Sequence, residues 1–220
     1  MLFTLLATIV ATSFWAQQPL CPVKEGVVLT YASKDAKGKV TSYSRQTVTS
    51  ITGSSSNHTL TYSIESLDAK KRPAKDIPII SYSYKVENGT IIIDPKAMLN
   101  GISTGTLYDS PAEGTSMLLP ANMKAGDKLP DCDVRMFLAF FRISAIYTEG
   151  VCEGEETITT EAGTFTCVKT KYNCKGSFAG VKTDMVIETW YAPGIGMVKQ
   201  EAINTKGKFV SLQELVELQA

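Results

Sequence analysis

The chain has 220 residues, a length at which an all-β barrel or sandwich is an ordinary single domain. Its 22 basic residues balance 22 acidic residues, so it has no overall field that would gather nucleic acid or an anionic membrane. The densest basic run, residues 70–75, has no aromatic residues between its charges and is interpreted as a solvated turn. The composition therefore predicts one domain and no nucleic-acid partner.

The first residues of the chain predict export. Residues 2–12 form an apolar run that is too short to span a bilayer and has the length of a signal-peptide core. Cleavage after Ala16 is favoured, although Ser13 better satisfies the preference for small residues near the cut. We expect residues 1–16 to be removed, and residues 17–220 to form the mature domain without a transmembrane anchor.

The first cysteine of the mature chain does not fit a lipid attachment site. A lipoprotein signal needs small residues just before the modified cysteine, but Cys21 is preceded by Pro19 and Leu20. The sequence therefore predicts a periplasmic or extracellular protein that is not a lipoprotein.

Segments with β-type patterns follow one another from residue 27 to the end of the chain, separated by turn signals. Asn88-Gly89 is the strongest hairpin signal. Pro95 and Gly101 permit one or two helical turns between them, and residues 100–114 are interpreted as irregular. The last segment also fits a helical period. The expected strands are 27–33, 40–52, 59–67, 79–87, 90–93, 116–119, 133–147, 151–160, 164–172, 181–191, 197–203 and 209–218.

This pattern predicts an all-β fold in which an antiparallel meander closes into a barrel or a strongly curved half-barrel. About ten to twelve strands are expected from the number of β-type segments, with at most one or two short helices.

Five cysteines remain after cleavage, and an oxidising compartment favours disulfides. If residues 161–164 form a four-residue turn, Ile158 faces Cys167, and one bulged residue brings Cys152 opposite Cys174. We therefore predict a Cys152–Cys174 disulfide and a buried free thiol at Cys167. A pairing of the other two cysteines, Cys21 and Cys132, is a further possibility.

No group of residues forms a recognisable catalytic or metal centre. Gly101–Gly105 spells G-x-S-x-G around Ser103, but that motif needs a histidine later in the chain. The only histidine, His58, lies upstream and is interpreted as an exposed loop residue. Asp131 and Asp133 are interpreted as solvated, and there is no C-x-x-C pair. The sequence predicts no enzyme, no catalytic residue, no metal and no cofactor.

One apolar run suggests a partner or a ligand. Residues 136–141 are apolar at six successive positions, whereas a strand with one buried face should alternate. The simplest interpretation is a central strand that is covered on both faces. The alternative is an apolar ligand cavity or a protein-contact surface, to which residues 117–119 could add. The candidate residues in the run are Met136, Leu138, Phe140 and Phe141.

Five segments together resemble a family of exported Bacteroidetes proteins that is grouped with the domain of unknown function 3108. Individually these motifs are modest, but their order and spacing span nearly the whole mature chain. The resemblance implies a periplasmic or envelope β-barrel-like domain, and the family has no established catalytic residues to carry over. Cys152 and Cys174 depart from its pattern. The segments are Cys21–Gly26, Asp35–Lys39, Gly126–Asp131, Glu156–Phe165 and Trp190–Gly196.

These observations lead to one functional hypothesis and one alternative. The first is a non-enzymatic binding or structural module of the cell envelope, whose partner the sequence does not identify. The alternative is a periplasmic carrier for a lipid or another apolar ligand, which is motivated by the apolar run at residues 136–141.

Overall fold

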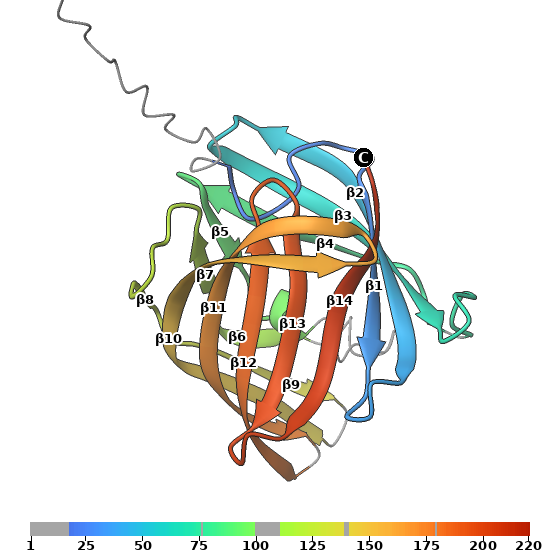
Figure 1. The fold of residues 1–220 in the computed structure, drawn as a ribbon, viewed down its shortest axis with the longest axis vertical. Helices are drawn as coiled ribbons and strands as arrows, with labels where there is room; N and C mark the ends of the chain where they lie inside the picture. The colour runs from blue at the N-terminus through green and yellow to red at the C-terminus, as the bar shows by residue number, and fades with distance from the viewer. Residues whose placement is uncertain (1–17, 76, 100–110, 139–140, 179) are drawn as a thin grey trace, which may run out of the picture.

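Fourteen strands of the computed structural model form one antiparallel sheet that curves into a nearly closed barrel (Figure 1). The structure describes residues 18–75, 77–99, 111–138, 141–178 and 180–220. The strands are β1 (Val28–Lys34), β2 (Val40–Gly53), β3 (Asn57–Asp68), β4 (Ile80–Glu87), β5 (Thr90–Ile93), β6 (Ala112–Thr115), β7 (Met117–Pro120), β8 (Lys128–Leu129), β9 (Cys132–Leu138), β10 (Phe141–Thr160), β11 (Gly163–Phe178), β12 (Val181–Ala192), β13 (Gly196–Asn204) and β14 (Phe209–Gln219).

The all-β antiparallel prediction is confirmed, but the expected number of strands was too low. The two strands that the sequence pattern missed are β6 and β8, which are too short to show alternation. The predicted strand 133–147 contains a hairpin, since Leu138 of β9 pairs with Phe141 of β10. The predicted break at residues 148–150 is a bulge inside β10 instead, with Glu149 at a φ of 56°.

The strand order explains how the barrel closes. The path of paired strands runs β6-β9-β10-β11-β12-β13-β14-β1-β2-β3-β4-β5-β7, and β8 pairs separately with β10. Its two ends, β6 and β7, are consecutive in the chain and are joined by Ser116 alone. The backbone itself therefore joins the two ends of the sheet, and we call this position the seam. Next to this link, the close pairing of β6 with β9 requires Gly114, because an added Cβ would lie 2.0 Å from the carbonyl oxygen of Asp133.

Alternating burial along the strands places one set of side chains inside the barrel. In β3 the inward positions are His58, Leu60, Tyr62 and Ile64, and all four are buried. His58 is therefore not an exposed loop residue as expected, because β3 begins one residue before it. Its Nδ1 lies 3.2 Å from the carbonyl oxygen of Ser54, whereas its buried Nε2 has no hydrogen-bond partner among the described residues.

The N-terminal segment closes one end of the barrel, at the top of Figure 1. Residues 19–22 are buried, and Leu20 and Cys21 belong to the main hydrophobic core. The segment is held against the β12–β13 turn, where the amide of Gly194 donates a hydrogen bond of 2.9 Å to the carbonyl oxygen of Pro19. The interior is therefore covered at this end by chain that precedes the first strand.

The end of the β10–β11 hairpin folds over the outside of the barrel and crosses in front of β12 and β13 in Figure 1. It buries a second small core that contains Ile158, Cys167, Trp190 and Val198. The indole Nε1 of Trp190 donates a hydrogen bond of 2.7 Å to Glu156 Oε2. This outer core explains why Cys167 is completely buried although it points away from the interior.

Helical structure is minor, as predicted. One 3₁₀ turn, η2 (Ala97–Leu99), is capped by Asp94, whose carboxylate accepts a hydrogen bond of 2.8 Å from the amide of Ala97. In the described ranges, no helix has both the length and the apolar character needed to cross a membrane.

Candidate binding cavity

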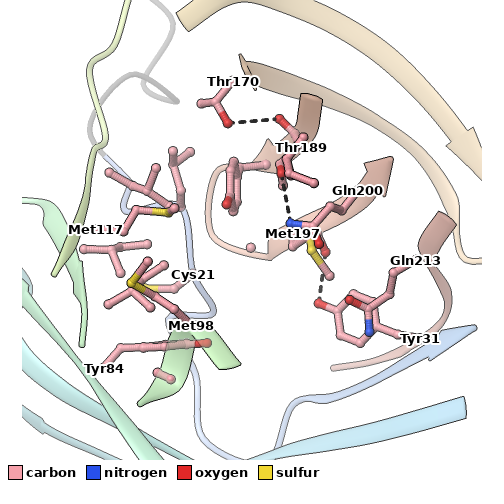
Figure 2. Close-up of a pocket in the computed structure, with 18 of the residues that line it drawn as sticks. Cys21, Tyr31, Tyr84, Met98, Met117, Thr170, Thr189, Met197, Gln200 and Gln213 are labelled. Carbon is pink, nitrogen blue, oxygen red and sulfur yellow. Dashed lines mark hydrogen bonds between the residues drawn. The ribbon is translucent and has the colours of Figure 1, made fainter. Parts of the chain in front are cut away.

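A cavity of about 440 Å³ lies inside the barrel, below the N-terminal segment. This volume is within the range of sites that hold small ligands. Figure 2 shows that the labelled residues form two walls, with Cys21, Tyr84, Met98 and Met117 on one side and the polar residues of β11–β14 on the other. We call them the apolar wall and the polar row.

The polar row crosses four neighbouring strands at one level. Thr170 of β11 pairs with Thr189 of β12, which pairs with Gln200 of β13, which in turn pairs with Gln213 of β14. The hydroxyl of Thr170 donates a hydrogen bond of 3.4 Å to the carbonyl oxygen of Thr189, and Gln200 Nε2 donates one of 3.1 Å to the Thr189 hydroxyl. Among the described residues, the Gln213 amide has no hydrogen-bond partner and is free to meet a ligand.

The apolar wall joins a cluster of tyrosine rings. The centroids of the Tyr82 and Tyr84 rings are 5.0 Å apart, and those of Tyr62 and Tyr84 are 5.5 Å apart. The Tyr84 hydroxyl donates a hydrogen bond of 3.1 Å to the Tyr82 hydroxyl. Met98 and Met117 add flexible thioether side chains, which adapt readily to ligand shape. This side of the cavity therefore offers aromatic and sulfur surface with few hydrogen-bonding groups.

The described lining of the cavity carries no formal charge. Among the described residues, those that line it include no Asp, Glu, Lys, Arg or His. Burial raises the pKa of the Cys21 thiol to about 12 and that of Tyr191 to about 12. Burial also raises the pKa of Tyr62 and of Tyr84 well above the ordinary value of a tyrosine. At neutral pH the lining groups are therefore uncharged, and the cavity offers hydrogen bonds and apolar surface.

The predicted Cys152–Cys174 disulfide is not formed, because the hairpin register differs from the expected one. Thr160 pairs with Gly163, so the turn has two residues rather than four. Cys152 consequently lies opposite Thr170, four residues or about 13 Å along β11 from Cys174. A disulfide needs Cα atoms within roughly 7 Å.

All five cysteines are free and buried, so the predicted buried thiol at Cys167 is confirmed and the suggested Cys21–Cys132 bond is not formed. Cys132 and Cys174 lie on the two strands that flank β10, and each pairs with Tyr147. These two cysteines are therefore separated by two strand spacings of about 4.8 Å each.

Of the apolar candidates, Met136 is the one whose side chain is described, and it is not among the residues that line the cavity. Met136 belongs to a separate core cluster with Val134 and Ile143. The side chains of Leu138 and Phe141, and all of Phe140, lie outside the described residues. Their role as ligand or contact residues therefore stays a prediction, whereas Met117 and Leu119, which were expected to join them, do line the cavity.

The remaining candidates have structural roles or lie outside the described residues. Asp133 forms an ion pair of 3.0 Å with Arg135, which lowers the pKa of its carboxyl group, and Asp131 accepts a hydrogen bond from the amide of Glu149. Within the described part of the chain, no cluster of three potential metal ligands occurs. Ser103 lies outside the described residues.

Together these features define an antiparallel barrel whose interior holds a neutral cavity. Residues 24–215 match the family model described as DUF3108-like, and the chain belongs to this family. A search of curated proteins gives no match.

Two crystal structures share the fold. One is of a "putative exported protein with YmcC-like fold" from Bacteroides fragilis, with a TM-score of 0.77 and 21% identity over 92% of this chain and 100% of the other. The second is of a "putative lipoprotein" from Parabacteroides distasonis, with a TM-score of 0.75 and 20% identity over 92% of this chain and 99% of the other.

Proposed function

We propose that the protein is exported to the cell envelope and acts as a non-catalytic carrier or receptor for an uncharged amphipathic ligand, which it holds in the barrel cavity. The observation that carries this proposal is the cavity of about 440 Å³ with an apolar wall, a polar row and no charged side chain among its described lining residues. Such a lining is typical of ligand sites, in which a few placed polar groups orient a mostly apolar molecule.

The two walls favour a particular orientation of the ligand. A hydroxyl, ester or amide group of the ligand would meet the side chains of Gln200 and Gln213 in the polar row. Its apolar part would pack against Met98, Met117 and Tyr84. A free carboxylate or phosphate would be disfavoured, since burying a charge without a partner costs far more than burying a neutral group. The ligand is therefore a neutral lipid-like molecule in this proposal.

The absence of catalytic function is proposed from the chemistry of the lining. General acid–base catalysis needs a group whose pKa lies near the working pH. The ionisable groups in the lining are thiols and phenols, and burial raises their pKa values away from neutrality. Thiols with raised pKa are poor nucleophiles. These properties support binding rather than turnover.

Export without lipid attachment is proposed from the leader-like residues 2–12 and from the position of Cys21. Acylation of Cys21 would attach lipid to a thiol that is 2% exposed and belongs to the main core. The residues just before it, Pro19 and Leu20, are packed as well. The descriptions of the two related structures, one an exported protein and one a lipoprotein, agree with an envelope location.

Native mass spectrometry tests the ligand. The full chain is expressed with its N-terminal segment, purified without detergent and analysed before and after organic extraction. We expect an extractable neutral molecule bound at about one per chain. Ser44→Phe, which fills the cavity wall on β2, should lose it, whereas Thr41→Phe at an exposed position of the same strand should retain it. A wild-type protein of clean apo mass, or equal loading of both variants, contradicts the proposal.

A further inference from the structure

The ends of four β-hairpins gather at the end of the barrel opposite the N-terminal segment, at the bottom of Figure 1. They lie together because neighbouring strands run in opposite directions. The hairpins are β1–β2, β9–β10, β11–β12 and β13–β14. We call this the turn end.

The turn end is basic, although the whole chain has no net charge. Six exposed Lys and Arg side chains lie in or beside the four turns, against the single carboxylate of Asp35. That carboxylate already accepts hydrogen bonds from the amides of its own turn, at 2.8 Å and 3.0 Å. The six cations are Lys37, Lys39, Arg142, Lys182, Lys206 and Lys208.

Other charges near the turn end lie further along the strands and balance one another. Asp133 forms an ion pair with Arg135, and Asp184 lies directly across from Lys175 on β11. The turns at the opposite end, β2–β3, β4–β5 and β12–β13, contribute no Lys or Arg. The cations of the turn end therefore have no counterpart in these three turns.

Large apolar side chains are exposed among these cations. Phe137, Phe178 and Val181 have exposed fractions of 65%, 50% and 66%. Phe178 and Val181 are direct cross-strand partners, and the Arg142 guanidinium lies 6.0 Å from the centroid of the Phe137 ring. The β11–β12 hairpin also extends past β13, which pairs with β12 only from Met185 onward. Phe178 and Val181 therefore lie beyond the end of β13.

We propose that the turn end docks onto the surface of a bilayer that contains anionic phospholipid. Exposed aromatic and aliphatic side chains at the tips would enter the headgroup region, and the surrounding cations would meet the lipid phosphates. A second copy of this chain does not fit the same surface, because two basic ends would face each other and repel. The charge and the apolar tips together match an anionic membrane interface.

Docking of this kind would orient the cavity relative to the membrane. Met185 and Ser211 line the cavity on the side of the turn end, and Ser211 is exposed. The inward-facing Phe178 and Val181 lie beyond them along the same inner face. The inference goes beyond the proposed function and does not depend on it, since the charge and the apolar tips are present whether or not a ligand is bound.

Vesicle flotation tests the docking with the full chain. The wild-type protein should float with vesicles of phosphatidylethanolamine and phosphatidylglycerol, and it should stay behind with vesicles of phosphatidylcholine alone. At about 1 M salt, where the Debye length is ~3 Å, binding to the anionic vesicles should fall. A wild-type protein that does not float with the anionic vesicles overturns the inference.

Two sets of variants separate the apolar and the electrostatic contributions. The triple variant Phe137→Ser/Phe178→Ser/Val181→Ser should lower partitioning about tenfold. Val23→Ser, which changes an apolar residue with an exposed fraction of 49% in the N-terminal segment at the opposite end, should not. Lys206→Glu/Lys208→Glu should weaken binding more than Lys124→Glu/Lys128→Glu, which changes one residue of the β7–β8 loop and the first residue of β8. Circular dichroism verifies that each variant folds.

Other occupants give different results. The apolar triple variant could float as well as the wild type, while dextran sulfate displaces both proteins from the vesicles. In that case the turn end is only a cationic surface that binds any polyanion, and the inference fails. Concentration-dependent dimers that the triple variant abolishes would assign the surface to a second copy and also overturn it. Native mass spectrometry of the same samples keeps the two proposals distinct. A loaded protein that does not float overturns the docking alone, and an empty protein that floats contradicts only the carrier function.

Discussion

The two ends of the barrel are built from the same kind of turn but have opposite properties. One end is closed by the buried segment 19–22, and three of its turns contribute no cation. At the other end, cations and large apolar side chains are exposed at the ends of the hairpins. In an antiparallel meander, successive turns lie at opposite ends of the sheet. The residues of every second turn therefore gather at the same end. A balanced total charge can therefore conceal a strongly uneven surface.

The largest expected effect lies where the end strand β6 packs against β9. Gly114→Val would place a Cβ against the Asp133 carbonyl at a φ of 142°, so we expect the free energy of unfolding to fall by about 4 kcal/mol or more. Gly38→Ala in the β1–β2 turn is the control, because its Cβ would meet nothing within 4 Å and only its φ of 76° opposes it. Urea titration measures both. Equal losses would show that the β6–β9 pairing is no tighter than a turn.

Truncating apolar side chains compares the stability of the two ends. Leu20→Ala at the closed end removes a core side chain that is 2% exposed, so we expect a loss of about 3 kcal/mol. Val181→Ala at the turn end should cost about 0.5 kcal/mol or less, because its side chain is 66% exposed. Urea unfolding at equilibrium gives both values. A large loss at Val181 would mean that this tip is packed in the folded protein rather than available to a membrane.

The buried thiols should make the protein sensitive to alkaline pH. Burial raises the pKa of Cys21, Cys132 and Cys167 to about 12, whereas in the unfolded chain these groups ionise near their ordinary pKa. The unfolded state therefore loses protons first, and stability falls as pH rises above about 9, by about 1 kcal/mol per pH unit for each thiol. Thermal unfolding between pH 7 and pH 10.5 measures this. Cys21→Ala should flatten the slope, and an unchanged slope in that variant contradicts the assignment.

A small effect is expected at Asp35, the one carboxylate in the turns of the turn end. Asp35→Ala removes the acceptor for the amides of Lys37 and Lys39 and should cost about 0.5 to 1 kcal/mol of stability. It also adds one net positive charge, so partitioning to anionic vesicles should rise while stability falls. Paired urea and flotation measurements detect the opposite signs. Weaker vesicle binding would contradict the electrostatic part of the docking.

The fold could be predicted because most strands alternate and most turns contain Gly, Asn or Asp. Where these signals were missing, the prediction failed. The β9–β10 connection has no turn residue, so the two strands were predicted as one. The β10–β11 turn and the bulges in β10 changed the register, and the disulfide prediction failed with it. Bulges depend on packing between strands, which local sequence does not specify.

The cavity could not be predicted from the sequence. Gln200 lies between Lys199 and Glu201, so nothing in its neighbourhood marks it as facing inward. The polar row exists only because four strands align in register, and that alignment depends on turn lengths along the whole chain. The sequence pattern instead indicated a candidate ligand site at the apolar run of residues 136–141, in which Met136 lies in a separate core.

The single-residue link at Ser116 has a mechanical consequence. Because the first and last strands of the sheet are tied by one residue, they cannot separate sideways to admit a molecule between them. The circumference of the ring is fixed, and cargo would have to pass through an open end rather than through a gap in the wall. The sheet also presents two edges of only four residues each, which offer little backbone to other strands and protect the protein from edge-to-edge aggregation.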